Sequence, residues 1–312
     1  MMPQTDRRWS HAPAMVWLPL AAGLLTGPAV AAQDPTKPAE LASLIATVAH
    51  GTPAERERAA MQLGRWGPQA AAAIPVLTRA LSDSSAVIRT AAARALGDIG
   101  PGVATDKAAL TTLIDVLHDH DWRVREAAAR TLGQLGAQAG LAIPALSQAL
   151  GNAQPEVYRA AADALAALGP NGTLALIRAL GQPSWWAKTE AADRLKRLGA
   201  SARPALLQAL DNPQEPSEIR LGIIQLLGEL GPETIPALVK IVATPSNDRP
   251  LRLTAMQALG RIGPAVAADP SALTAIKQWL RDPEPEFRTA ASQALATIEP
   301  SPRHEPGERL DE

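Results

Sequence analysis

The stretch Val124-Arg125-Glu126-Ala127-Ala128-Ala129-Arg130-Thr131-Leu132-Gly133-Gln134-Leu135-Gly136 decides the fold, because the chain repeats variants of it at nearly constant spacing. Each copy begins with an apolar residue, and the next residue is usually an arginine. Two variable positions, two small residues, two further variable positions, a leucine and often a glycine follow in that order. The leucines of the successive copies follow one another at intervals of 30 to 36 residues: Leu63, Leu96, Leu132, Leu165, Leu195, Leu227, Leu259 and Leu295. A repeat of this length predicts a solenoid, in which each unit buries its apolar face against its neighbours.

The spacing within the quoted copy predicts a helix with one buried face. Val124, Ala128, Leu132 and Leu135 lie at i, i+4, i+8 and i+11, and residues at these intervals share one face of a helix. Alanine on that face allows a neighbouring backbone to approach closely, and leucine fills the space beyond. The helix is expected to end at a glycine in the left-handed conformation of a C-terminal cap. The glycines at this position are Gly100, Gly136, Gly169, Gly199, Gly231 and Gly263.

A second apolar segment precedes each copy and predicts the first helix of a hairpin, as in residues 74–81, 143–150 and 235–241. A proline such as Pro75 is tolerated in the first turn, whereas a helix that began earlier would be kinked by it, and the sequence leaves both possibilities open. The chain is therefore predicted to be all-α, a right-handed α-solenoid of about eight hairpins over residues 33–299. The second helices are expected to line its concave side.

The composition agrees with closely packed helices. Of 312 residues 46% are hydrophobic and only 3% aromatic, so alanine and leucine must supply most of the buried surface. A net charge of −1 gives no general attraction to nucleic acid or to an anionic membrane. The chain has no cysteine, which excludes disulfides, thiolate metal sites and thiol nucleophiles.

The two ends of the chain differ from the repeats. Residues 1–32 combine Arg7 and Arg8 with an apolar run over 15–25 and small residues at 29–32, which is the layout of a secretory signal peptide. We expect cleavage next to Ala31 or Ala32, with no stable membrane anchor afterwards and a periplasmic or secreted product. The alternative is an uncleaved anchor helix, although prolines interrupt the run and it barely reaches the length of a span. Residues 300–312 are polar and rich in proline, and we expect them to be disordered.

The repeated Val-Arg-x-x-Ala-Ala-x-x-Leu-Gly pattern resembles HEAT repeats, in the short-repeat subclass similar to phycobilisome-lyase subunits. The resemblance covers nearly all of the chain after residue 32. It implies an armadillo-like superhelix of the kind that binds other proteins, and it implies an arginine ladder between units. Because this scaffold serves many unrelated functions, the resemblance is specific for the fold and weak for the activity.

The motif arginines have two possible roles. They recur at Arg89, Arg125, Arg220, Arg252 and Arg288. A row of cations could bind an anionic partner, or each arginine could donate hydrogen bonds to acidic or amide residues in neighbouring turns. The candidate acceptors are Asp83, Asp119 or Asp121, Asn152, Asp211 and Asp282. The structural role is favoured, because the nearby variable positions alternate in sign and form no basic stripe.

The candidate binding site lies where the middle copies depart from the pattern. Tyr158 and Lys188 replace the motif arginine in the fourth and fifth units. Trp185 and Trp186 lie just before the second helix of the fifth unit, and Trp122 occupies the position equivalent to Trp185 in the third. Tryptophan is costly to expose and is enriched at binding hot spots. We therefore predict an aromatic patch for a protein or peptide partner. In the alternative interpretation, these rings fill grooves between irregular turns.

No catalytic residue, metal site or cofactor site is predicted. His118 and His120 are the only clustered histidines, they lie in a predicted turn, and no third ligand is identifiable. The HEAT-like deoxyhypusine hydroxylases use His-Glu pairs on their helices, and the single such pair here, His304-Glu305, lies in the tail. No phosphate-binding loop or nucleophile motif is present.

The sequence therefore predicts an exported, non-catalytic scaffold that binds a protein or peptide through its concave surface and binds no nucleic acid. The alternative function is a lyase-like or chaperone-like subunit related to the phycobilisome-lyase HEAT proteins. The predicted signal peptide counts against this alternative, because the family works in the cytoplasm. The absence of cysteine also counts against it, because no residue is present to hold a bilin.

Overall fold

The computed structural model describes residues 36–244 and 248–299. The predicted signal peptide, residues 1–32, and the predicted tail, residues 300–312, lie outside these ranges. Every regular element in the described part is a helix, which confirms the all-α prediction. None of these helices has the length and the apolar character needed to cross a membrane.

The helices alternate between two roles along the chain. The copies of the repeated motif form the second helices, which are α2 (Pro53–Arg65), α4 (Ala86–Ile99), α7 (Trp122–Leu135), α9 (Pro155–Ala167), α11 (Trp185–Leu198), α13 (Ser217–Leu230), α15 (Arg249–Ile262) and α17 (Pro285–Ile298). The first helices are α1 (Thr36–His50), α3 (Ile74–Ala80), α5 (Pro101–Thr105) with α6 (Lys107–Asp115), α8 (Ile143–Ala149), α10 (Pro170–Ala179), α12 (Arg203–Asp211), α14 (Ile235–Ala243) and α16 (Pro270–Lys277). Short 3₁₀ segments join many of them, at Gly67–Ala73, Val116–His118, Gly136–Ala142, Gly199–Ser201, Pro232–Thr234, Gly263–Ala268 and Gln278–Arg281.

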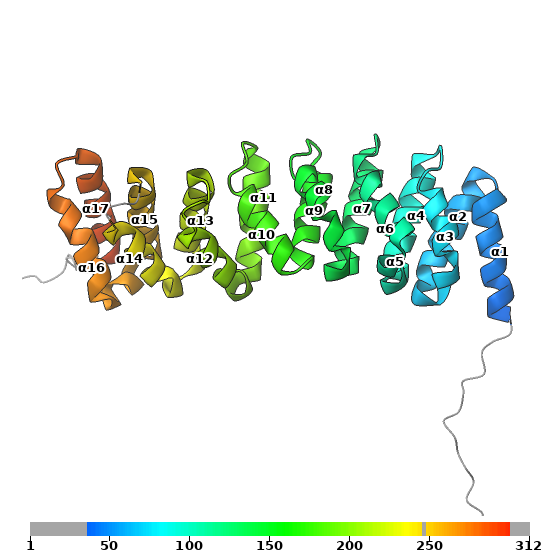
Figure 1. Cartoon of the computed structure of the whole chain (residues 1–312), viewed down its shortest axis with the longest axis horizontal. Coiled ribbons are helices and arrows are strands. Elements are labelled where there is room, and N and C mark those ends of the chain that lie inside the picture. Colours follow the sequence, from blue (N-terminus) through cyan, green and yellow to red (C-terminus); the bar gives the residue numbers. More distant parts are fainter. Residues whose placement is uncertain (1–35, 245–247, 300–312) are drawn as a thin grey trace, which may run out of the picture.

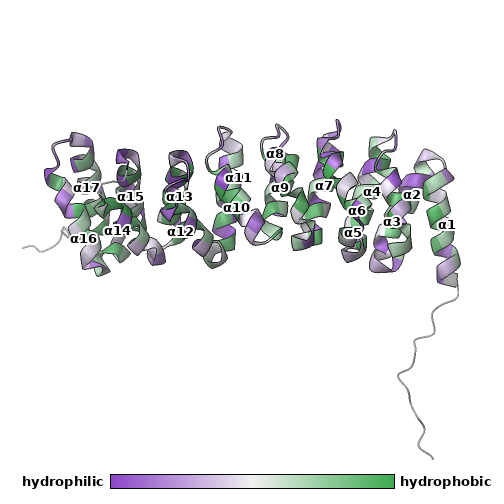
Figure 2. Cartoon of the chain, viewed as in Figure 1, coloured by the Kyte–Doolittle hydropathy of each residue, from purple (hydrophilic) through white to green (hydrophobic). Residues whose placement is uncertain are grey.

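The hairpins stand side by side in one long row, with α1 at one end and α17 at the other (Figure 1). The turns from α3 to α4, α8 to α9 and α10 to α11 lie along the upper edge of that view. Apolar residues run through every hairpin and do not gather in a single centre (Figure 2). Each unit therefore buries its apolar face against its neighbours, as a solenoid requires.

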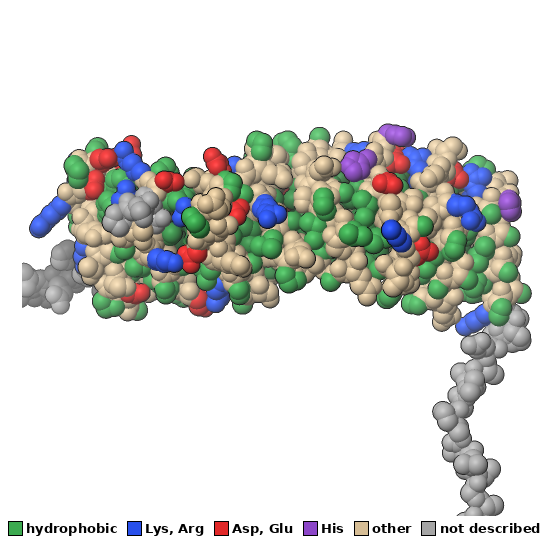
Figure 3. All heavy atoms as spheres, in the orientation of Figure 1, with side chains coloured by type: hydrophobic (Ala, Val, Ile, Leu, Met, Phe, Trp, Pro, Cys, Tyr) green, Lys and Arg blue, Asp and Glu red, His purple; other side chains and the backbone are tan. Residues whose placement is uncertain are grey.

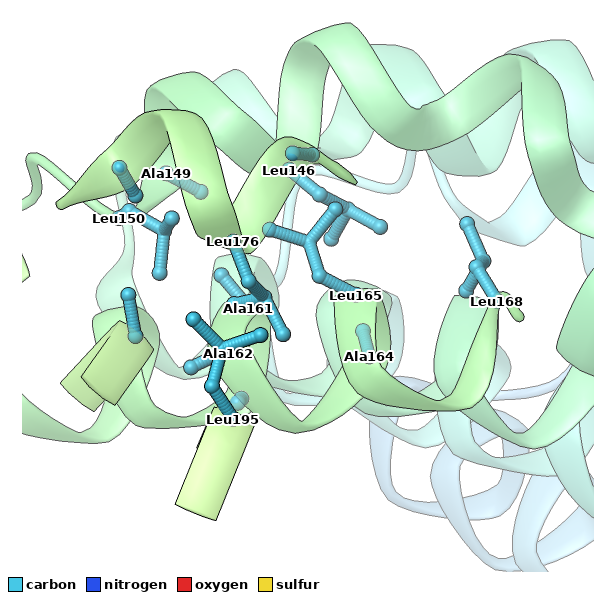
Figure 4. Close-up of a cluster of buried hydrophobic side chains, with 14 of the residues drawn as sticks. Leu146, Ala149, Leu150, Ala161, Ala162, Ala164, Leu165, Leu168, Leu176 and Leu195 are labelled. Carbon is cyan, nitrogen blue, oxygen red and sulfur yellow. The ribbon is translucent and has the colours of Figure 1, made fainter. Parts of the chain in front are cut away.

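The predicted buried face of the quoted copy is confirmed. Val124, Ala128 and Leu132 are fully buried in α7, and Leu135 is buried near its end. The next copy repeats the arrangement, with Ala161, Ala162 and Leu165 of α9 packed among leucines of α8 and α10 (Figure 4). Small residues let the helices approach, and leucines fill the space between hairpins.

The glycines that end the second helices have positive φ angles, as predicted, but they are not in the left-handed helical conformation. Gly136 has φ 61° and ψ −148°, and Gly100 has φ 78° and ψ −130°. This region is accessible essentially only to glycine, so the requirement for glycine is stricter than a left-handed cap would impose. The question about the prolines is also settled, because α3 begins at Ile74 and Pro75 lies in its first turn after a separate 3₁₀ segment.

The second helices pack directly on one another, and glycine makes the closest of these contacts possible. A Cβ atom on Gly133 of α7 would lie 2.9 Å from the Ala164 Cα of α9. Gly228 and Gly260 approach Ala258 and Ala294 of the following helices in the same way. The motif glycine therefore has a packing role between units.

Replacing Gly133 by alanine is expected to lower the free energy of unfolding by about 1–3 kcal/mol, because the added methyl group forces two backbones apart. Gly140 is the matched control, since nothing lies within 4 Å of a Cβ atom placed there. Gly140→Ala should leave stability unchanged or raise it by about 0.4–1 kcal/mol, because alanine restricts the unfolded chain. Urea unfolding of both variants checks this expectation, and equal effects at the two positions would contradict the close packing of α7 on α9.

Candidate partner-binding surface

The motif arginines of the N-terminal half connect successive units along the edge formed by the turns. Arg89 donates two hydrogen bonds of 2.8 Å to the Asp119 carboxylate, and another of 2.8 Å to the Asp83 carbonyl oxygen. The degenerate first copy has the same contact between Arg56 and Asp83, at 3.0 Å. Arg125 donates to the Asp119 carbonyl oxygen at 2.6 Å and reaches the Asn152 side chain at 3.5 Å. These arginines are therefore occupied by contacts within the chain.

The Arg89–Asp119 pair is buried and changes the ionisation of both groups. Burial acts to raise the pKa of Asp119, but hydrogen bonds from Arg89 and from the Asp121 amide, together with the charge of Arg89, outweigh it. The pKa of Asp119 therefore lies below its ordinary value. The hydrogen bond to Asp119 also raises the pKa of Arg89. Both groups remain charged at neutral pH.

The pair is expected to make stability depend on pH in the acidic range. Because the pKa of Asp119 is lower in the folded than in the unfolded chain, its contribution is complete above the unfolded value of about 3.9 and is lost as the pH falls through the folded value. The difference in unfolding free energy between the wild type and Asp119→Asn should therefore be constant above about pH 5 and shrink below about pH 4. Urea unfolding between pH 2 and pH 7 measures it. A difference that stays constant down to pH 2 would rule out this linkage.

The motif arginines of the C-terminal half make different contacts from those of the N-terminal half. Arg252 lies over the rings of Trp279 and Phe287, at 4.9 and 5.3 Å from their centroids. Arg288 donates to the carbonyl oxygens of Asp282 and Pro283, both at 2.8 Å. The half-buried Arg220 occupies the corresponding position of α13, and the carboxylate of Asp211 accepts from Lys240 at 2.7 Å.

A stack of aromatic rings replaces the arginine contact between α9 and α11. Tyr158, at the arginine position of α9, stacks on Trp186 with ring centroids 6.4 Å apart. Trp185 meets Trp186 edge to face at 5.9 Å. Tyr158 is buried and Trp186 is partly buried, whereas Trp185 is 69% exposed. The two tryptophans thus differ in kind, since Trp186 joins units and Trp185 faces solvent.

The other two predicted residues lie around this stack in different ways. Lys188 is exposed on α11, one turn beyond Ser184, the residue that caps the helix. Trp122 begins α7, with α9 between it and α11, and its partly buried ring lies beneath Arg123 at 4.9 Å. Tyr158, Trp185 and Trp186 therefore form one cluster, called here the aromatic patch, and Trp122 is a separate residue on the same edge.

Helix α11, which carries the two tryptophans of the aromatic patch, also departs from the close packing of the other second helices. Glu190 and Arg194 of α11 occupy positions where most second helices have small residues, and Lys196 replaces the motif glycine. Arg194 is buried and pairs with Glu190 at 3.1 Å and with Asp163 of α9. Lys196 pairs with Glu229 of α13. Contacts of α11 with α9 and α13 are accordingly sparser than those between other neighbouring second helices.

A second feature, which the sequence did not reveal, is a hollow between α2, α4 and the start of α7. It has a volume of about 440 Å³ and contains Met61 and Val87, which are 47% and 55% exposed. Arg65, Arg94 and Asp98 stand around it. The departure of Met61 from the polar residues of the later copies was visible in the sequence, but its proximity to Val87 needed the helices to be placed.

The two clustered histidines do not form a metal centre in the part of the chain that the structure covers. His118 Nε2 lies 3.2 Å from Gln148 Oε1 of the next unit, and His120 is exposed. No group of three or more His, Asp or Glu side chains among the described residues is placed to hold a metal ion. On the face shown in Figure 3, Lys and Arg side chains are interspersed with Asp, Glu and hydrophobic side chains.

Comparison with known families identifies the repeat. The family model of HEAT repeats matches residues 41–108, 102–166, 143–217 and 203–296. The successive matches overlap and run from the first hairpin to the last. No curated protein shows a significant match.

Three solved structures have partial similarity to this chain. An engineered protein is 23% identical, with 83% of this chain and 78% of that one covered and a TM-score of 0.42. Human deoxyhypusine hydroxylase in complex with glycerol is 24% identical, with 85% and 97% covered and a TM-score of 0.32. The complex of CpcE and CpcF of phycocyanin lyase from Nostoc is 24% identical, with 85% and 98% covered and a TM-score of 0.41. These likenesses concern the fold alone.

Proposed function

The chain belongs to the HEAT-repeat family, and from this premise we propose that it is an exported, non-catalytic scaffold that binds a protein or peptide partner. HEAT repeats typically bind other proteins through the extended surfaces that stacked hairpins provide. The proposal places one partner contact at the aromatic patch. Export is proposed from the N-terminal sequence, residues 1–32, which has the layout of a signal peptide.

The observation that carries the binding proposal is the exposure of Trp185. Its ring is 69% exposed although it adjoins a partly buried tryptophan, and it begins the helix at which the regular contacts between units are interrupted. Tryptophan anchors account for much of the energy of protein interfaces when they enter a partner's pocket. Lys188 on the same helix adds a positive charge that would favour an acidic group beside the anchored ring.

The neighbouring rings hold the Trp185 side chain in position for contact with a partner. Trp186 supports it edge to face and is itself held by Tyr158. A ring that is positioned in advance loses less conformational freedom on binding. The stack therefore has a supporting role, and Trp185 is the residue that meets the partner.

A photo-reactive amino acid with a bulky aromatic side chain, placed at residue 185 so that an anchoring ring is kept there, tests the proposal in the native host. Cross-linking should yield one discrete conjugate in the periplasmic or secreted fraction, which mass spectrometry identifies. The matched control is the same substitution at Leu141, which is 73% exposed but lies before α8, away from the aromatic patch. Absence of a conjugate at residue 185, or the same conjugate at both positions, counts against the proposal.

A further inference from the structure

The hollow between α2 and α4 is an exception to the polar surface of the second helices. Residues at the position of Met61 in the next two second helices are Arg94 and Arg130, and the position of Val87 is occupied by Arg123 in α7. Met61 and Val87 are nevertheless exposed, and the hollow of about 440 Å³ between them has room for an apolar side chain from another molecule. Burial of such a side chain would stabilise a complex.

The surface beside the hollow presents positive charge to solvent. Arg94 and Arg130 share one buried carboxylate, that of Glu126, with Arg94 Nη2 3.5 Å from it and Arg130 Nε hydrogen-bonded to it. The arginine side chains are 62% and 65% exposed, against 10% for Glu126. One carboxylate cannot neutralise two guanidinium groups, and both keep N–H donors free for a ligand.

Around the hollow, Arg65 and Arg123 are accompanied by the carboxylates of Glu57, Asp98 and Asp121. With Arg94, Arg130 and Glu126 the region holds four arginines and four carboxylates, which differ in exposure. Arg65 is exposed, and Arg123 is 63% exposed beside Asp121, which is 25% exposed and caps α7. Glu57 is partly buried, and Asp98 is the exposed carboxylate of the lining. Three of the four carboxylates are less exposed than the arginines, so the charged groups that a partner would meet at the surface are mainly guanidinium groups, which suit an acidic partner.

The basic character is confined to this part of the surface. The position of Arg94 and Arg130 holds Asp163 and Asp193 in the middle helices, and Gln225, Gln257 and Gln293 in the last three. A partner whose carboxylates met Arg94 and Arg130 would therefore find no equivalent site further along the row. The charge pattern selects one location for it.

We propose that the hollow binds a partner segment in which one apolar side chain lies between Met61 and Val87 and flanking Asp or Glu carboxylates pair with Arg94 and Arg130. This inference rests on the proposed function, the binding of a protein partner, and it specifies the chemistry of the segment recognised. The site is separate from the aromatic patch on α11.

Selection of random dodecapeptides displayed on phage against the full chain tests the proposal. Enriched sequences should share an apolar residue flanked by Asp or Glu. A synthetic peptide of that sequence is then titrated by fluorescence anisotropy against the wild type, Val87→Glu and Arg94→Gln. Affinity should fall at least about tenfold with each variant, because one fills the hollow with a charge and the other removes a guanidinium partner.

The chain offers matched controls for both substitutions. Leu141→Glu also places a carboxylate at an exposed apolar residue, and Arg159→Gln removes an arginine that is 59% exposed and pairs across helices at 3.3 Å. Both controls should bind the peptide like the wild type.

Enrichment of basic peptides, enrichment of no peptide, or affinity unaffected by Val87→Glu would overturn the assignment of the hollow. A conjugate that still forms at residue 185 in that case would leave the proposed function standing. Loss of both results would remove the proposed function as well.

Discussion

Replacing Leu132 by alanine is expected to lower the free energy of unfolding by about 2–5 kcal/mol. Leu132 is fully buried in α7, which packs against α4 on one side and α9 on the other. Truncation removes the apolar contacts of the side chain and leaves a cavity that helices held at close range cannot collapse to fill. Because units of a solenoid support only their neighbours, the loss should appear as an earlier urea unfolding transition of the hairpins around α7.

Leu141→Ala provides the control for this measurement, since Leu141 is 73% exposed. Its free energy of unfolding should stay within about 0.5 kcal/mol of the wild type, as surface substitutions usually do. A loss below about 0.5 kcal/mol for Leu132→Ala would contradict the burial of the motif leucine between hairpins.

The sequence predicted the repeating part of the fold because each copy contains its own helix signal. The buried face of α7 from Val124 to Leu135 follows from the local pattern, whereas the place of Pro75 in a first turn is known only from the structure. The conformation of Gly136 was predicted only in part. Its φ is positive, but its ψ of −148° depends on how the next 3₁₀ segment leaves the helix.

The sequence predicted the residues of the candidate site but not which of them pack between units and which face solvent. Trp185 and Trp186 are adjacent, and consecutive residues of a helix point about 100° apart. Which of them faces inward depends on how α11 is set against α9, and α11 has Glu190, Arg194 and Lys196 where α7 has Ala127, Thr131 and Gly133. The structure shows Trp186 against Tyr158 and Trp185 in solvent.

The hollow at Met61 and Val87 could not be predicted for a related reason. The two residues belong to different units, 26 positions apart, and occupy different positions of the repeat. Only the lateral packing of α2 on α4 brings them together. Repeat patterns report the contacts that every unit makes, and they do not report a surface that one pair of units makes alone.

Trp185→Ala is expected to abolish partner binding while the fold is retained. Removing an exposed ring should change the free energy of unfolding by no more than about 0.5 kcal/mol. Loss of an anchoring tryptophan at an interface typically costs about 2 kcal/mol or more, which corresponds to a fall in affinity of about thirtyfold or more. Trp186→Ala should behave differently, because it removes the ring that stacks on Tyr158 and should lower stability.

The central claim is tested most directly by comparing Trp185→Ala with the wild type in two measurements. These are capture of the partner identified by cross-linking and the melting temperature. The claim is that the regular repeats provide the fold and the interruption at α11 provides the binding site. We predict an unchanged melting temperature and capture weaker by about thirtyfold or more for Trp185→Ala. Undiminished capture, or unfolding of the variant at a clearly lower temperature, would contradict the account.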